Sequence, residues 1–286
     1  MQTSTVRTLL VRGMIAGVVA GLLAFALAYV VGEPSIDSSI ALEESQSAPA
    51  HEHDGASGAS DASDASDAAG APAAPAEEEE ELVTRPVQST FGLATGVLVY
   101  GVALGGIASL AFAICLGRVG RLRPRATAAL VAGAAFTTVY LVPFLKYPAT
   151  PPAVGNPDTI GKRTTLFFLM IALSVLVAVI AVIAGRRLAP ALGNWNATVA
   201  AGGGYVVVMA LACLLLPANT DAVKETFPAA LLWEFRLASL GVQALLWTAF
   251  GLIFGALAER VLRPVDAQAD GRGPEAVTGA PAARAG

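Results

Sequence analysis

Long runs of apolar residues that contain no charge constrain this chain more than any other feature. Residues 13–31 read GMIAGVVAGLLAFALAYVV, and runs of similar length recur along the chain. A helix needs about 20 such residues to cross about 30 Å of hydrocarbon, whereas a soluble core has no need of them. Only 14% of the residues are charged, against about 25% in soluble domains. We therefore predict a polytopic membrane protein that has the lipid bilayer around it.

The predicted fold class is an all-α membrane helix bundle with about six transmembrane helices. The expected spans are residues 13–31, 91–117, 126–145, 165–184, 198–216 and 237–257. Membrane strands would alternate polar and apolar residues, and these runs are apolar on all sides. One alternative stays open at the start of the chain. Residues 24–28, AFALA, resemble a signal-peptide cleavage site, and cleavage after Ala28 would leave five spans.

The flanking charges predict the orientation. Lys and Arg collect in short cytoplasmic loops, and a cytoplasmic N-terminus places 12 of the 18 basic residues inside and 18 of the 22 acidic residues outside. Both chain ends are then cytoplasmic, and we expect the plasma membrane as the location. The predicted organisation is an N-terminus with the first helix over 1–31, an outer loop over 32–90, a five-helix bundle over 91–257, and a disordered cytoplasmic tail over 258–286.

The outer loop is acidic and carries both histidines of the chain. His51 and His53 lie two residues apart, so in an extended chain they point the same way. With Glu52 and Asp54 they offer the imidazole and carboxylate ligands that divalent transition metals use. The alternative is a solubilising acidic linker in which two histidines fall together by chance. The composition around them, rich in Ala, Ser, Gly and acid, predicts disorder over residues 45–78.

The two ends of this loop differ from its middle. Residues 32–44, GEPSIDSSIALEE, predict a short amphipathic helix along the membrane surface. Asp37 and Glu44 would share one face of it and add to the candidate metal ligands. Arg85 stands alone among acids, so we expect it to pair with one of them. The alternative for Arg85 is an ordinary surface salt bridge worth under about 1 kcal/mol.

Two further outer loops hold candidate residues. Asp158 lies in a proline-rich segment that excludes helix and is either a ligand or part of an ordinary turn. Trp233 and Arg236 lie in a predicted interfacial helix, where aromatic rings settle in the headgroup layer, so anchoring is the expected role.

The span centres carry no Asp, Glu, Lys, Arg or His. Neutral groups must therefore supply any coordination inside the membrane, and Tyr100, Met209 and Cys213 are among the candidates. Glycines, by contrast, recur at every fourth position in several spans. Such small-xxx-small rows favour close approach of two helices, within the chain or with a partner helix. Gly202–Gly204 predict a bend in the fifth span. The rows are Gly13/Gly17/Gly21, Gly101/Gly105 and Gly251/Gly255.

Signatures of enzymes are missing from the sequence. It contains no P-loop, no H-E-x-x-H and no G-x-S-x-G motif. We therefore expect a protein that is not an enzyme and has no nucleic-acid partner. The two cysteines lie near opposite ends of their spans, too far apart for a disulfide.

Four stretches together resemble the CbtA family in its actinobacterial form. They are GEPSIDSSIALEE, EELVTRPVQSTFGLATG, KYPATPPAVGNPDTIGKRT and FPAALLWEFRLASLGVQALLW. The resemblance covers the chain apart from the middle of the first loop and the tail. It implies a subunit of a cobalt uptake transporter, linked to cobalamin synthesis, that works with a small one-span CbtB-like partner bearing a histidine-rich end. By position, His51 and His53 fit a histidine-containing first loop, and Arg85 and Gln88 fit the RxxQ step before the second span.

The resulting functional prediction is a membrane subunit whose acidic outer loop collects a divalent transition metal. Co²⁺ is the expected cargo rather than a cofactor, and the same ligands suit Ni²⁺. The alternative from another class is a membrane scaffold that transports nothing and binds partner helices through its glycine faces. Carriage of an organic solute is a third option.

Overall fold

The computed structural model describes residues 3–47, 84–120, 122–151, 154, 159–218 and 227–262. Regular structure in these ranges is helical throughout, and no strand occurs there. The elements are α1 (Thr3–Leu27), the π-helix η1 (Ala28–Gly32), α2 (Glu33–Ser47), α3 (Arg85–Val87), the π-helix η2 (Gln88–Gly92), α4 (Leu93–Cys115), α5 (Pro124–Ala135), the π-helix η3 (Phe136–Leu141), α6 (Val142–Lys146), α7 (Ile160–Leu215) and α8 (Ala229–Leu262).

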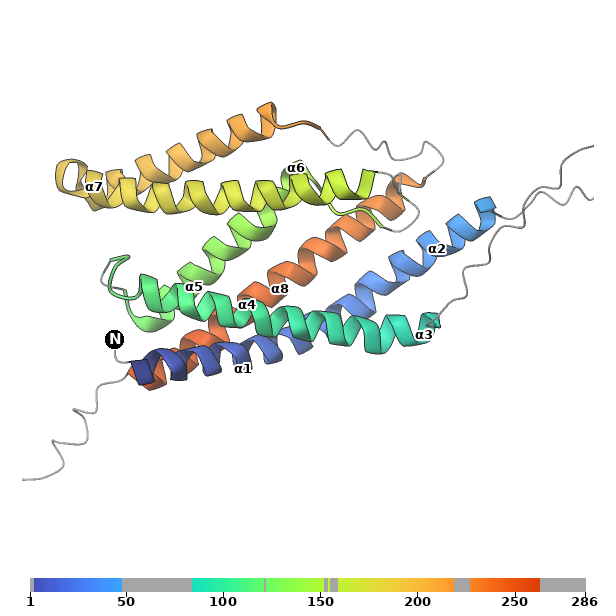
Figure 1. The fold of residues 1–286 in the computed structure, drawn as a ribbon, viewed down its shortest axis with the longest axis horizontal. Coiled ribbons are helices and arrows are strands. Elements are labelled where there is room, and N and C mark those ends of the chain that lie inside the picture. Colours follow the sequence, from blue (N-terminus) through green and yellow to red (C-terminus); the bar gives the residue numbers. More distant parts are fainter. Residues whose placement is uncertain are drawn as a thin grey trace, which may run out of the picture.

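Five continuous helical stretches in the described ranges are long and apolar enough to cross a membrane. The longest of them, α7, folds back on itself at Gly193, where φ is 77° and ψ is 158° (Figure 1). The Ser174 Oγ lies 2.8 Å from the Tyr205 hydroxyl, which ties the two arms together. The arms correspond to the predicted fourth and fifth spans. The predicted all-α polytopic bundle is therefore confirmed, and its count of about six crossings agrees with four single helices and one hairpin.

The tightest packing joins α1 to α4. Gly13 and Gly17 face Gly105 and Gly101 with the helices antiparallel, and a Cβ atom at Gly101 would stand 2.6 Å from the Gly17 carbonyl oxygen. Gly21 continues the row against the Val97 carbonyl. Glycine is needed here because any side chain would push the backbones apart. The glycine rows of the first two spans thus pack on each other within this chain.

The sixth span uses its glycines in a different contact. A Cβ atom at Gly251 on α8 would stand 2.9 Å from the Ala132 side chain of α5. Nearby, the Phe112 and Phe254 rings meet edge to face at 5.1 Å and join α4 to α8. At the end of the bundle that holds the N-terminus, Arg12 donates to the Leu257 carbonyl at 2.8 Å. Helices α1, α4, α5 and α8 therefore form the core of the fold.

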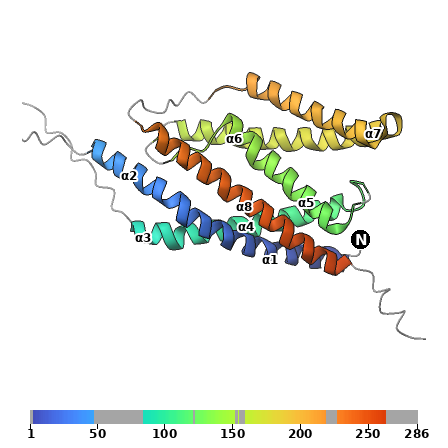
Figure 2. The same ribbon diagram turned by 180° about the vertical axis from the view of Figure 1, so that it is seen from behind.

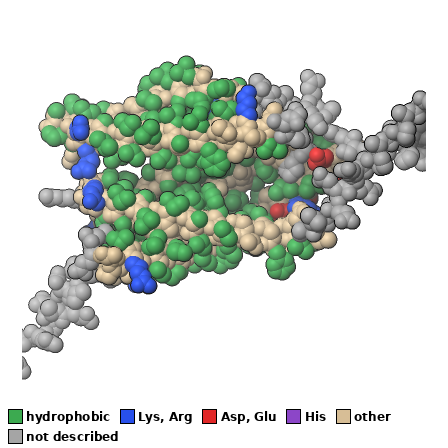
Figure 3. All heavy atoms as spheres, viewed as in Figure 1, with side chains coloured by type: hydrophobic (Ala, Val, Ile, Leu, Met, Phe, Trp, Pro, Cys, Tyr) green, Lys and Arg blue, Asp and Glu red, His purple; other side chains and the backbone are tan. Residues whose placement is uncertain are grey.

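The α7 hairpin forms a separate layer that joins this core mainly through η3 and α6 (Figures 1 and 2). Tyr147, which follows α6, donates its hydroxyl to the Pro217 carbonyl at 2.9 Å and so fixes the end of the hairpin. Figure 3 shows the molecular surface hollowed between α7 and α4. Apolar side chains cover much of the hairpin's exposed surface, which suits contact with lipid.

The first helix extends beyond its predicted end at Val31. The backbone N–H of Glu33 donates to the Ala28 carbonyl, so the helical path continues through η1 into α2. Residues 32–44 are helical as predicted. They continue α1, however, rather than forming a separate helix that turns to lie along the membrane surface (Figure 2).

Candidate functional site

The two ends of the bundle differ in charge. Figure 3 shows several Lys and Arg side chains gathered at the end that holds the N-terminus and others near the opposite end, whereas the acidic side chains visible on this face lie at that opposite end. We call the end that carries Glu33 and Asp37 the outer end, after the predicted orientation. The opposite end, which carries Arg12 and Arg125, is the inner end.

Arg85 holds the outer end together. Its Nη2 lies 2.7 Å from Glu33 Oε2 and 2.7 Å from Asp37 Oδ1, and its Nε donates to the same Asp37 oxygen at 3.0 Å. The predicted pairing of Arg85 with an acid is therefore confirmed, with two acids instead of one. Glu33 is nearly enclosed, with 9% of its side chain exposed, whereas 61% of the Asp37 side chain is exposed. This contact joins α2 to α3, the two stems of the acidic loop.

The predicted metal ligands divide into two groups. Asp37 and Glu44 lie on α2, and Asp37 is already bound by Arg85. His51, Glu52, His53, Asp54 and Asp158 lie outside the described residues. Within the described ranges, no group of three or more His, Cys, Asp or Glu side chains comes close enough to hold a metal ion. The described bundle therefore offers no preformed centre of carboxylates, imidazoles and thiolates.

The other predicted outer residues take separate positions. Gln88 begins η2, directly after α3. Trp233 lies on the first turns of α8 with 61% of its surface exposed, as an interfacial anchor requires. Arg236 donates from Nε to the Ala149 carbonyl at 3.3 Å and so ties α8 to the segment after α6.

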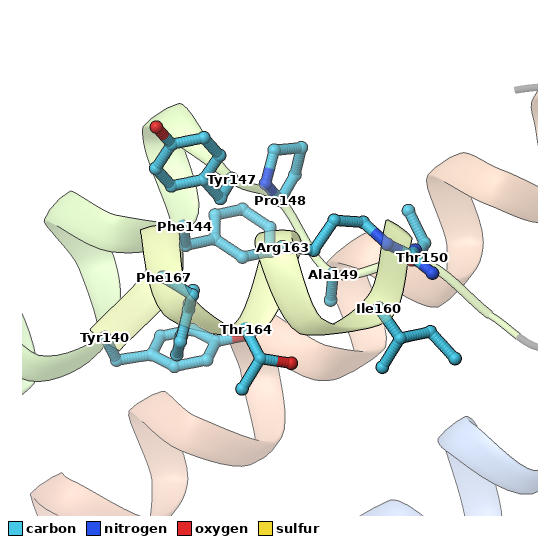
Figure 4. Close-up of a pocket in the computed structure, with 10 residues that line it drawn as sticks. All are labelled: Tyr140, Phe144, Tyr147, Pro148, Ala149, Thr150, Ile160, Arg163, Thr164 and Phe167. Carbon is cyan, nitrogen blue, oxygen red and sulfur yellow. The ribbon is translucent and has the colours of Figure 1, made fainter. Parts of the chain in front are cut away.

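A cavity of about 410 Å³ opens beside that segment (Figure 4). Arg163 extends toward Thr150 on one side of it, and Tyr140 lies on the opposite side. Burial, and secondly the nearby Cys213, raise the pKa of the Tyr147 phenol, so this hydroxyl stays protonated and donates to Pro217. The lining residues are Tyr140, Phe144, Tyr147, Pro148, Ala149, Thr150, Ile160, Arg163, Thr164 and Phe167.

A cluster of neutral polar side chains lies where α4, η3 and α8 meet, and we call it the tyrosine–glutamine cluster; its side chains are half-buried except that of Tyr100, which is 38% exposed. Its members are Tyr100 on α4, Tyr140 on η3, and Ser239 and Gln243 on α8. The Tyr140 hydroxyl lies 2.7 Å from Ser239 Oγ, and the Gln243 side chain is hydrogen-bonded to the Tyr100 hydroxyl. Sequence reasoning named only Tyr100. The spacing of Ser239 and Gln243, one helical turn apart, was the available signal for the rest.

The remaining neutral candidates have other partners or ordinary packing. Thr137 and Thr138 donate to carbonyls one turn earlier on the same helix. Met170 and Met209 pack between the arms of the α7 hairpin. Both cysteines are free thiols, as predicted from their separation.

These features define a multi-pass membrane protein whose two ends differ in charge, with a cavity at the outer end and a half-buried polar cluster among its helices. The sequence model of the family described as "Probable cobalt transporter subunit (CbtA)" matches residues 6–259, so the chain belongs to that family. The predicted resemblance is thereby confirmed. A transporter subunit implies both a metal-ion substrate and a partner. No curated protein and no solved structure matches the chain.

Proposed function

We propose that this protein is the membrane subunit of a cobalt uptake system and that its acidic outer loop collects the ion. The observation that carries the proposal is the Arg85 contact with Glu33 and Asp37, because it holds the two stems of that loop together at the outer end. The loop between the stems contains the His51/His53 pair and 10 of the 22 acidic residues of the chain. Its negative potential raises the local concentration of dications beside the bundle.

The proposed cargo is Co²⁺, with Ni²⁺ as the competing ion, since imidazole and carboxylate ligands suit both. The proposed ligands are His51, Glu52, His53 and Asp54, with Glu44 nearer the bundle. The proposed location is the plasma membrane, and the proposed partner is a small one-span protein with a histidine-rich end. Packing of Gly13 and Gly17 against α4 supports transport over the scaffold alternative, because those glycine faces are covered within the chain.

Uptake of ⁵⁷Co by cells at limiting supply tests the proposal. Cells that lack the protein should accumulate less cobalt than cells that have it. Deletion of residues 45–79 should reduce uptake at low cobalt and leave it near normal when cobalt is in excess, because the loop only concentrates the ion. The matched control replaces residues 45–79 with an uncharged Gly/Ser linker of equal length. Equal uptake by deleted and intact proteins at low cobalt would contradict the collecting role.

A further inference from the structure

Two enclosed side-chain atoms on α8 have no hydrogen-bond partner in the described part of the chain, one within the tyrosine–glutamine cluster and one a helical turn beyond it. The Gln243 Oε1 is enclosed and receives no hydrogen bond there, and the same holds for the Nε1–H of Trp247, one turn further along α8. Trp247 is only 4% exposed. An enclosed polar atom without a hydrogen-bond partner lowers the stability of the fold by about 1–3 kcal/mol. Each such atom is therefore expected to bind a ligand or a water, or to serve a function.

The two unpartnered atoms require different partners. Gln243 Oε1 is an acceptor, so it needs either a cation or a donated proton. The Trp247 N–H is a donor, so it needs an acceptor and repels a bare cation. A metal ion that keeps part of its water shell suits Gln243 Oε1, since it presents positive charge and water protons to that acceptor. The hydroxyl oxygens of Tyr100, Tyr140 and Ser239 add further lone pairs in the same cluster.

Tyr140 connects this cluster to the outer end of the bundle. It lines the outer cavity and also contacts Ser239 of the cluster. The guanidinium of Arg163, which belongs to the cavity wall, extends toward Thr150 on the side away from Tyr140 (Figure 4). Tyr140 also lies in η3, and π-helical turns inside α-helices occur frequently at functional sites.

We propose that Tyr100, Tyr140, Ser239 and Gln243 form the transit site at which a partly hydrated divalent cation passes through the bundle. The inference rests on the proposed function and adds the path of the ion to it. Neutral oxygens suit this task because they hold a dication weakly enough to release it. A carboxylate at the same depth would bind the ion more tightly and would carry a desolvation cost when empty.

Initial rates of ⁵⁷Co uptake across a range of cobalt concentrations test the transit site in cells that express the full chain. Tyr140→Phe removes one hydroxyl oxygen and keeps the ring, and Gln243→Leu replaces the whole carboxamide by apolar carbon. Each should lower the maximal rate by about tenfold, the loss typical when a group that orients a metal site is removed. Excess cobalt should not restore it. Gln243→Leu should change the amount of folded protein little, because removal of the unpartnered buried Oε1 offsets the loss of the hydrogen bond to Tyr100.

Tyr205→Phe is the matched control. It breaks a Tyr–Ser hydrogen bond of the same kind inside the α7 hairpin, away from the cluster. Its maximal rate should equal that of the wild type. The inference is overturned if Gln243→Leu transports at the wild-type maximal rate, as it would if the cluster held only a structural water. It is also overturned if Tyr205→Phe loses as much activity as Tyr140→Phe. A wild-type protein that moves no cobalt would instead refute the proposed function itself.

Discussion

Gly17 and Gly101 face each other so closely that a Cβ atom on Gly101 would stand 2.6 Å from the Gly17 carbonyl oxygen. The obstacle is backbone, which cannot rotate away as a flexible side chain can. The contact therefore fixes the distance between α1 and α4, and through them the position of both stems of the acidic loop. Close approach of this kind supplies the van der Waals contacts that hold helices together in lipid.

Gly101→Ala should destabilise the protein by about 1–3 kcal/mol, because the added methyl group overpacks the interface. Thermal unfolding of the purified protein in detergent measures the effect. Gly96→Ala on the same helix is the control, since nothing lies within 4 Å of a Cβ there. It should leave the melting temperature unchanged or raise it slightly. Equal melting temperatures for the two variants would show that α1 and α4 do not meet through Gly101.

The Arg85 contact predicts unequal roles for its two acids. Arg85→Gln leaves Glu33 nearly enclosed and without its cation, so it should destabilise the protein by about 1–3 kcal/mol. Adding Glu33→Gln to that variant should restore most of the loss, because it removes the stranded charge. Asp37→Asn should cost less, since 61% of the Asp37 side chain is exposed. Detergent melting of the three variants and the wild type measures this, and a double variant no more stable than Arg85→Gln would contradict the pairing.

The spans and the glycine rows were predictable because both depend on local sequence. An apolar run of about 20 residues has few structures open to it. Glycine rows likewise predict close packing, although which rows meet depends on the three-dimensional arrangement. The pairing of the first span with the second, and of the sixth with the third, therefore came only from the structure.

The tyrosine–glutamine cluster was largely missed for the same reason. Tyr100, Tyr140 and Gln243 lie on three elements far apart in sequence, and each is an ordinary residue in its own helix. The bend predicted at Gly202–Gly204 was wrong, because those glycines are helical and the chain reverses at Gly193. A chain reversal at a single glycine is harder to recognise in the sequence than a run of three consecutive glycines.

The reversal at Gly193 can be tested directly. Its φ of 77° and ψ of 158° lie in a region that residues with a Cβ atom rarely adopt. Gly193→Ala should therefore destabilise the α7 hairpin by about 1–3 kcal/mol. Gly203→Ala lies in open helix with nothing within 4 Å of its Cβ, so it should be neutral or stabilising. Detergent melting compares the two, and a neutral Gly193→Ala would mean that the arms join in another way.

Charge at the two ends of the bundle predicts which side of the membrane each end faces. Basic residues concentrate at the inner end and are retained in the cytosol during insertion, whereas the acid-rich loop starts from the outer end. An epitope tag inserted near residue 60 should therefore react with antibody on intact spheroplasts, and a tag at the C-terminus should react only after permeabilisation. The C-terminal tag serves as the control for membrane integrity. A residue-60 tag that reacts only after permeabilisation would place the His51/His53 pair in the cytosol, and an outer metal collector could not exist there. The basic residues of the inner end in the described ranges are Arg7, Arg12, Arg118, Arg123, Arg125, Arg186, Arg187 and Arg260.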